Sequence, residues 1–175
     1  DETYQLRTPE QLTNVGQLPN AAFNQTHDIA IADGSFPAIA TFGGSYNGGS
    51  LMITVGTGAE WMTETTGTVQ NVNLKVNGTI TEPIFGNVTG TLDTVAVTCS
   101  STASSLIDSV SGTDTADASL TNVDLTITGE VTAFAGSGLL VNSLGSYSGI
   151  TNCDVNAGSV VLNASDIPVY TVGTT

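Results

Sequence analysis

The chain of 175 residues carries 16 aspartate and glutamate residues against two lysine and arginine residues, so its formal net charge is −14. With only Arg7 and Lys75 available to neutralise phosphates, nucleic-acid binding and attachment to anionic membrane surfaces are excluded as functions. No apolar run approaches the roughly 20 residues of a membrane-spanning helix, so no membrane insertion is expected, and the length fits one domain.

The composition indicates a folded all-β chain with many turns. Hydrophobic residues make up 39% of the chain and charged residues only 10%, which is not the profile of a disordered protein. Threonine, serine, asparagine and glycine are abundant, and valine and threonine favour strands over surface helices. Scarce lysine beside abundant threonine, serine and asparagine is also typical of secreted surface proteins. We therefore expect an extracellular or cell-surface location.

The first segment predicts one short helix. Thr8 stands at the N-cap, Pro9 at the first helical position and Gln11 at the third position after the cap, which is the arrangement of a capping box. We expect the helix to run from about Pro9 to Leu18. Its buried face is expected to carry Leu12, Val15 and Leu18, which are spaced three apart.

Short strands joined by glycine-rich corners are expected next. Asp28–Ala32, Phe36–Ile39 and Leu51–Val55 supply apolar strands, and residues 42–49 are rich in glycine. We assign residues 1–66 to an N-terminal cap and the first coils of a repetitive structure. Residues 67–175 are assigned to the repeats themselves, within one continuous domain.

From about residue 67 the sequence repeats itself. Four segments share the order apolar, any residue, Asn or Thr, Val or Cys, any residue, apolar. These segments are Thr68–Val76, Thr91–Cys99, Ser119–Ile127 and Gly149–Ala157. The third position of the pattern falls at Asn71, Thr94, Asn122 and Asn152. The interval between these positions matches one coil of a solenoid better than a hairpin pair.

Side-chain parity within these segments predicts an inner and an outer face. Val72 and Leu74 alternate with polar neighbours and would face inward. Val69 lies three positions before Val72, so a left-handed bend between them is needed if both are to point inward. Such bends are predicted at Asn71, Asn122 and Asn152. A second apolar block ending in glycine precedes the repeats at 83–90 and 138–145, and two strands per coil predict a parallel β-helix.

The repeated segments resemble the GLUG-type repeat of bacterial and archaeal surface proteins. The likeness is strongest from Gly138 to Val155 and weaker at 84–97 and 66–76, and residues 4–12 are similar to the segment that often precedes such repeats. The chain departs from the pattern at Leu140–Val141, where a second glycine is usual, and in the polar insertion at 100–118. The resemblance implies an extracellular right-handed β-solenoid of adhesin-like or wall-associated proteins, and it supplies no catalytic residues.

Catalysis is not expected. His27 is the only histidine and lies in the leading segment, far in sequence from Cys99 and Cys153, so we expect a surface or packing role for it and no histidine triad or multi-histidine metal site. Hydrolysis of a sugar by carboxylates alone needs two carboxyl groups that face one bond. Asp93, Asp124 and Asp154 occupy outward positions of stacked strands and would line a groove there, although solvated surface positions are the simpler interpretation. We predict a non-enzymatic protein and keep a carbohydrate-active domain as the alternative.

An acidic, glycine-containing insertion at residues 108–117 has the oxygen-rich composition of a calcium loop. Asp108, Asp114 and Asp117 would supply carboxylates to an ion that takes about six to eight oxygen ligands. The spacing matches no EF-hand. A solvated loop is therefore preferred, with calcium as the one candidate cofactor.

Two cysteines and a few aromatic residues are the remaining candidates. Cys99 and Cys153 occupy different repeat positions, so two separate buried thiols are favoured over a bridge. Trp61 and Tyr147 are aromatics suited to stacking on a sugar or contacting a protein. Together with Asp124 and Asp154 they form the predicted ligand-binding set.

The sequence therefore predicts a right-handed parallel β-helix with a helical N-terminal cap and a β tail near Val160–Val172. We expect it to be an adhesin-like module or rigid spacer, part of a larger surface protein, whose partner is a host or matrix protein or a neutral glycan. A carbohydrate-binding or carbohydrate-active domain is the first alternative. An ice-binding solenoid with outward threonines is the second, although Asp124, Asp154 and Asn156 interrupt a regular threonine array.

Overall fold

The computed structural model describes residues 2–31, 34–132 and 138–161. From residue 162 onward, the predicted β tail near Val160–Val172 lies outside the described residues. In chain order the elements are β1 (Thr3–Leu6), α1 (Pro9–Thr13), the 3-10 helix η1 (Asn14–Gln17), β2 (Ala22–Gln25), β3 (Ile29–Ile31), β4 (Ile39–Phe42), β5 (Ser45–Asn47), β6 (Met52–Val55), β7 (Met62–Thr65), β8 (Thr68–Ile80), β9 (Phe85–Val88), β10 (Thr91–Thr102), β11 (Ile107–Val110), β12 (Ala118–Thr132), β13 (Val141–Leu144), β14 (Ser148–Thr151) and β15 (Asp154–Val161).

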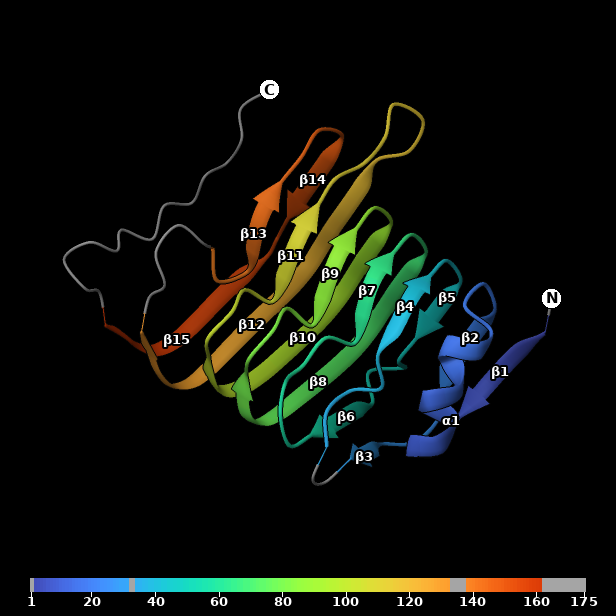
Figure 1. Cartoon of the computed structure of the whole chain (residues 1–175), viewed down its shortest axis with the longest axis horizontal. Helices are drawn as coiled ribbons and strands as arrows, with labels where there is room; N and C mark the ends of the chain where they lie inside the picture. The colour runs from blue at the N-terminus through green and yellow to red at the C-terminus, as the bar shows by residue number, and fades with distance from the viewer. Residues whose placement is uncertain (1, 32–33, 133–137, 162–175) are drawn as a thin grey trace.

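The strands form two sheets, and the chain alternates between them. The large sheet follows the order β1-β2-β5-β8-β10-β12-β14, with β6 beside β8, β3 beside β6 and β15 beside β12. The small sheet follows the order β13-β11-β9-β7-β4. All pairings between these strands are parallel. Figure 1 shows the short strands of the small sheet lying in front of the long strands of the large sheet. The all-β prediction is confirmed.

The predicted repeats lie side by side in register. Thr68 of β8 pairs with Thr91 of β10, which pairs with Ser119 of β12, and Ser119 pairs with Gly149 of β14. Parallel pairing is also present before residue 67, in the segment assigned to the cap and the first coils, because Ser45 of β5 pairs with Thr68 of β8. Regular stacking therefore extends well into residues 1–66.

Left-handed corners occur where the sequence predicted them. Asn71, Asn122 and Asn152 have φ values of 53°, 53° and 52°, and Thr94 occupies the equivalent position in β10 with φ 56°. The bend places Val69 and Val72 in the core, where both are 0% exposed. The break in strict alternation is therefore the signature of a bent strand.

The threonine at one of these corners predicts a stabilising substitution. A β-branched residue is disfavoured at positive φ, whereas asparagine tolerates it. Thr94→Asn is expected to raise the free energy of unfolding by about 1 kcal/mol, because it relieves this strain. Urea denaturation measures the change, with Asn122→Thr as the reciprocal variant that is expected to lose a similar amount. A lower urea midpoint for Thr94→Asn would contradict the assignment of strain to this corner.

The predicted helix is shorter than expected. Thr8 Oγ1 accepts a hydrogen bond from the Gln11 N–H at 3.3 Å, as a capping box requires. Gln11 Oε1 accepts a hydrogen bond at 2.7 Å from the N–H of Arg7, one residue before the Thr8 N–H that a capping box would use. The α-helix ends at Thr13 and continues as a 3-10 turn. Leu18 leaves that turn with φ −129° and is 44% exposed. Its predicted burial was wrong, because the tighter turn and the extended exit rotate its side chain away from the core.

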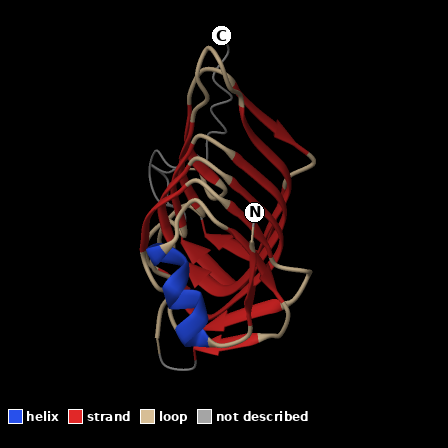
Figure 2. Cartoon of the chain, turned by 90° about the vertical axis from the view of Figure 1, so that its right-hand side faces the viewer, coloured by secondary structure: helices blue, strands red, loops and turns tan. Residues whose placement is uncertain are grey.

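One apolar cluster fills the space between the sheets. It includes buried residues from Leu6 near the start of the chain to Leu140 close to β13. Leu12 and Val15 of the helical segment belong to it and are 0% exposed. Figure 2 looks onto the N-terminal end of the molecule, where this helix lies across one side of the strands. The helix therefore covers apolar side chains that would otherwise face water at that end.

Candidate functional site

The outward face of the large sheet consists of side chains stacked in register. One column contains Asn73, Ala96, Asp124 and Asp154 on β8, β10, β12 and β15. A second column, two positions further along each strand, contains Lys75, Thr98, Thr126 and Asn156. Neighbouring strands of a sheet lie about 4.8 Å apart. The sheet therefore presents side chains at a regular spacing over a buried core, and all of them except Ala96 are polar.

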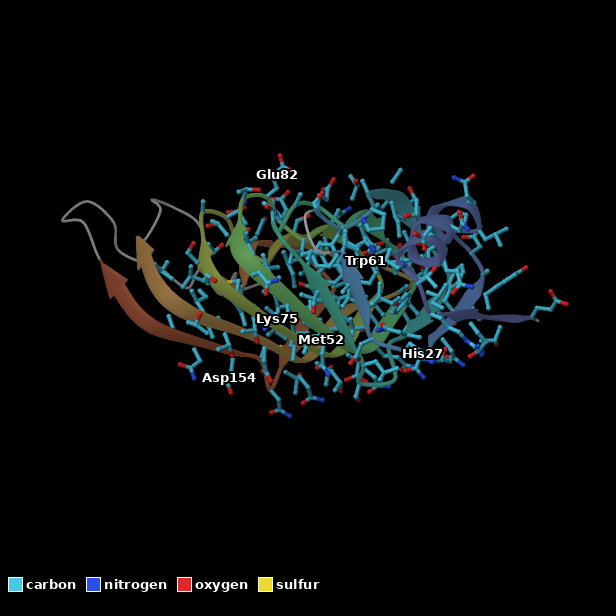
Figure 3. The ribbon with its side chains drawn as sticks, turned by 90° about the horizontal axis from the view of Figure 1, so that it is seen from below. His27, Met52, Trp61, Lys75, Glu82 and Asp154 are labelled. Carbon is cyan, nitrogen blue, oxygen red and sulfur yellow. The ribbon has the colours of Figure 1, made fainter. Side chains whose placement is uncertain are left out.

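Asp124 and Asp154 are brought together on this face. They are register partners on β12 and β15, and both are exposed. They line a shallow hollow of about 400 Å³ together with Leu125, Thr126, Val155 and Asn156. Figure 3 shows the Asp154 side chain pointing away from the body of the molecule. The hollow is the candidate site that best matches the sequence prediction.

Asp93 does not join this pair. It pairs with Gln70 and Thr121 in a different column, and its Oδ1 accepts hydrogen bonds from Thr94 Oγ1 at 3.0 Å and Asn122 Nδ2 at 3.4 Å. Among the described residues, no aromatic side chain lines the hollow between the other two carboxylates. Asp124 and Asp154 are both exposed, whereas a glycosidase needs environments that give its two carboxyl groups different roles. The geometry of this hollow therefore suits polar contacts better than catalysis.

Trp61 is not a surface residue, so the prediction that it contacts a ligand was wrong. It is 0% exposed, and its ring stacks on Phe36 at 5.6 Å, meets Tyr46 edge-on at 5.3 Å and contacts Phe85 at 6.0 Å. Figure 3 shows it within the body of the molecule. The cause is its position directly before β7, because Ile84 directly before β9 and Leu106 directly before β11 face inward in the same way.

Tyr147 is the exposed member of the predicted ligand-binding set. It is 53% exposed and forms the corner between β13 and β14 with φ 53°. Its carbonyl accepts the Ala118 N–H at 2.9 Å, which places it at the start of β12 beside the 113–117 loop. It does not line the hollow at Asp124 and Asp154. The structure therefore divides the predicted set between two locations.

The carboxylates of the predicted calcium loop are not gathered around a common point. Asp108 lies on β11 and accepts a hydrogen bond from Asn142 Nδ2 at 3.0 Å. Asp114 and Asp117 are exposed at a turn whose backbone closes from the Thr113 N–H to the Ala116 carbonyl at 2.7 Å. Within residues 2–31, 34–132 and 138–161, no group of three or more His, Cys, Asp or Glu side chains is placed to hold a metal ion. The loop is closed by its own backbone and threonine hydroxyls.

The outward threonines do not form a regular array. Thr121 pairs with Thr151. In the neighbouring column, however, Thr98 pairs with Lys75 and Thr126 pairs with Asn156, so the threonines do not continue onto the adjacent strands. His27 is exposed, with Nδ1 3.3 Å from Thr26 Oγ1. Neither arrangement adds an ice-binding or catalytic feature to the described surface of the large sheet.

Both cysteines are free thiols at inward positions. Cys99 is buried between Val76 and Ile127, and burial raises its pKa to about 11. Cys153 is half-buried, and its Sγ accepts the Val123 N–H at 3.4 Å. Burial also raises the pKa of Cys153, and the carboxylates of Asp124 and Asp154 add to this rise. Both thiols are therefore held in the neutral form and serve as apolar packing groups.

This burial predicts a loss of stability in alkali. An unfolded thiol has an ordinary pKa of 9.0, whereas that of Cys99 in the fold is about 11. The contribution of the neutral thiol is therefore fully present below pH 9 and is lost as pH rises toward 11, because the unfolded chain releases its proton first. Urea denaturation between pH 7.5 and 11 is expected to show this decline, and a smaller one in Cys99→Val. Identical declines in both proteins would contradict the assignment to Cys99.

The comparisons with known proteins give no family to which the chain can be assigned. It matches no protein-family model, and no curated protein and no solved structure is significantly similar to it. In the part of the chain that the structure describes, no helix is long and apolar enough to cross a membrane.

Proposed function

We propose that the chain is a rigid, non-enzymatic module of a larger extracellular or cell-surface protein, with the outward face of its large sheet as the contact surface for a partner. In this proposal the two sheets close into a right-handed parallel β-helix of the GLUG type. The alternation of the chain between two parallel sheets and the stacked left-handed corners support that architecture. Each strand then depends on its neighbours for burial of its inner face, which makes the module stiff.

The observation that carries the proposal is the regularity of the outward columns. Polar side chains on β8, β10, β12 and β15 stand in register over a buried inner layer. A partner that binds such a surface meets groups that are already ordered, so little conformational entropy is lost on binding. The described strands of this face carry Asp93, Asp124 and Asp154 against Lys75, so the partner is a protein or a neutral glycan and not a polyanion.

An array of neutral glycans, acidic glycans and extracellular-matrix proteins tests the proposal. The purified chain is expected to bind a matrix protein or a neutral glycan and to leave heparin and other polyanions unbound. Retention on polyanions, or the absence of binding to every protein and neutral glycan on the array, would contradict it. Hydrolysis of a sugar that disappears with Asp124→Asn or Asp154→Asn would instead establish the carbohydrate-active alternative.

The hollow at Asp124 and Asp154 favours a neutral glycan as the second candidate partner. Carboxylates together with the hydroxyl of Thr126 and the amide of Asn156 supply acceptors and donors to sugar hydroxyl groups. The double variant Asp124→Ala, Asp154→Ala would then lose glycan binding on the same array while it keeps the wild-type unfolding transition. Unchanged glycan binding by the double variant would remove this site from consideration.

A further inference from the structure

Two asparagines of the chain are followed directly by glycine, in the pairs Asn47–Gly48 and Asn77–Gly78. The main-chain nitrogen after an asparagine is a nucleophile that can attack the amide carbon of the asparagine side chain. A glycine at that position hinders the attack least, because it has no Cβ and the widest choice of backbone angles. Both pairs therefore have a sequence suited to deamidation, and they differ in their surroundings in the fold.

The pair Asn47–Gly48 is held in place by its neighbours. Asn47 Oδ1 accepts hydrogen bonds from the Gly49 N–H at 3.0 Å and from Asn71 Nδ2 at 3.2 Å. The Gly48 N–H donates to the Gln70 carbonyl at 2.9 Å, and Gly48 is buried. The attack would require the Gly48 nitrogen to leave its acceptor and the Asn47 amide to rotate away from two donors. These hydrogen bonds therefore oppose deamidation of Asn47.

The pair Asn77–Gly78 lies at an irregularity of β8. On the side of β10 the register shifts between Cys99 and Ser101, so that Asn77 and Gly78 together oppose Ser100 alone. Two residues against one is the count of a β-bulge, in which the extra residue is left out of the ladder. Ser100 Oγ donates to the Asn77 carbonyl at 2.7 Å. This contact holds the main chain of Asn77 and not its side-chain amide.

The ladder is interrupted on the other side of β8 as well. Regular pairing with β6 ends at Val76, and the next parallel bridge on this side joins Ile80 to Gly58. Asn77 is exposed and Gly78 is half-buried. Within the described residues, the second pair therefore combines an exposed side-chain amide with a main chain that lies outside the regular ladder.

We propose that Asn77 is a site of spontaneous deamidation, with water as the only co-reactant. The Gly78 nitrogen forms a bond to Cγ of Asn77 and gives up its proton, and the side-chain nitrogen leaves as ammonia. The product is a five-membered succinimide. Water then opens one of the two ring C–N bonds. Cleavage beside the side-chain carbonyl gives aspartate, and cleavage beside the main-chain carbonyl gives isoaspartate.

The reaction changes the large sheet at one place. Either product adds a carboxylate to a chain whose formal charge is already −14, two positions after Lys75, the only lysine. Isoaspartate also adds one methylene group to the main chain of β8, and a bulge accommodates this extra length where a regular ladder would lose its register. The inference is independent of the proposed contact surface, because the reaction needs only this segment and water.

Peptide mapping by mass spectrometry tests the inference on the full chain. The wild-type protein is incubated at neutral pH in two samples, one folded and one unfolded in urea, and the acid produced at each asparagine is followed over time. In the folded sample Asn77 is expected to react at least about tenfold faster than Asn47, because Asn47 must first break its hydrogen bonds. In urea the two rates are expected to converge. Asn77→Gln is expected to remove the product at residue 77 and to leave the slow reaction at Asn47 unchanged.

Equal rates at the two asparagines in the folded protein would overturn the proposal. An unreactive Asn77 in the folded protein would also overturn it, provided that both asparagines react in urea. The same digest reveals a sugar attached to Asn77, which belongs to the acceptor sequence Asn77–Gly78–Thr79. Such a sugar would overturn the proposal too, because it occupies the nitrogen that has to leave.

Discussion

Trp61→Ala is expected to lower the free energy of unfolding by about 3–5 kcal/mol, the range found when large buried aromatic side chains are truncated. Trp61 is 0% exposed and joins Phe36, Tyr46 and Phe85, which come from three separate parts of the chain. Its removal leaves a cavity that these three rings cannot all close, because each is fixed by its own strand or loop. Urea denaturation followed by far-ultraviolet circular dichroism measures the loss.

Trp61→Phe separates packing from hydrogen bonding at the same position. The Trp61 Nε1 atom is buried and has no hydrogen-bond partner in the described part of the chain. Phenylalanine keeps an aromatic ring and removes an unsatisfied donor, so a loss of only about 1 kcal/mol is expected. Losses of equal size in Trp61→Ala and Trp61→Phe would show that the indole nitrogen has a partner and that packing is not the main contribution.

Gly90→Ala is expected to destabilise the protein by about 3 kcal/mol, because the stacked corner leaves no space for a side chain. A Cβ at residue 90 would lie 2.1 Å from the Gly67 carbonyl oxygen, and a Cβ at Gly67 would lie 2.1 Å from that of Gly44. The same approach brings the Thr91 N–H within 2.9 Å of the Gly67 carbonyl. A methyl group must push neighbouring strands apart and break these contacts.

Gly149→Ala is the matched control for this prediction. Gly149 belongs to the same register column as Thr91 and Ser119, yet a Cβ there would meet no atom within 4 Å. Thermal unfolding of both variants is expected to show a large decrease in midpoint for Gly90→Ala and almost none for Gly149→Ala. Similar midpoints would mean that the two glycines occupy equally open positions, contrary to the stacking described above.

The part of the fold that the sequence predicted is the part with the most regular spacing. The corners at Asn71, Asn122 and Asn152 were predictable because two apolar residues three positions apart flank each of them. Both apolar residues can face inward only if one residue between them adopts a left-handed conformation. The repeat could be aligned in the sequence only from about residue 67, because the corner before it differs in length. Residues 48–51 connect β5 to β6. In β8, the positions that pair with the end of β5 and the start of β6 are separated only by residues 71 and 72. An insertion of this kind hides the repeat in the sequence while the strand register continues.

The candidate site was only partly predictable for a related reason. Asp124 and Asp154 were found together because they hold the same place in consecutive repeats. Trp61 was assigned to the surface because an isolated tryptophan is amphipathic, but alignment with Ile84 and Leu106 at the same strand start would have placed it inside. The calcium prediction rested on composition alone, and composition does not say whether three carboxylates converge. Register, when it is readable, is therefore the more reliable guide.

The measurement that tests the proposed contact surface most directly compares two double variants in binding to the strongest ligand of the array. Ala96→Arg with Asp124→Arg alters exposed positions of the large sheet, and Thr63→Arg with Asp108→Arg alters exposed positions of the small sheet. Each pair replaces one neutral and one acidic residue, so the net charge changes equally. We predict that the large-sheet variant loses binding and the small-sheet variant keeps it. Retained binding in the large-sheet variant, or equal loss in both, would contradict the proposal.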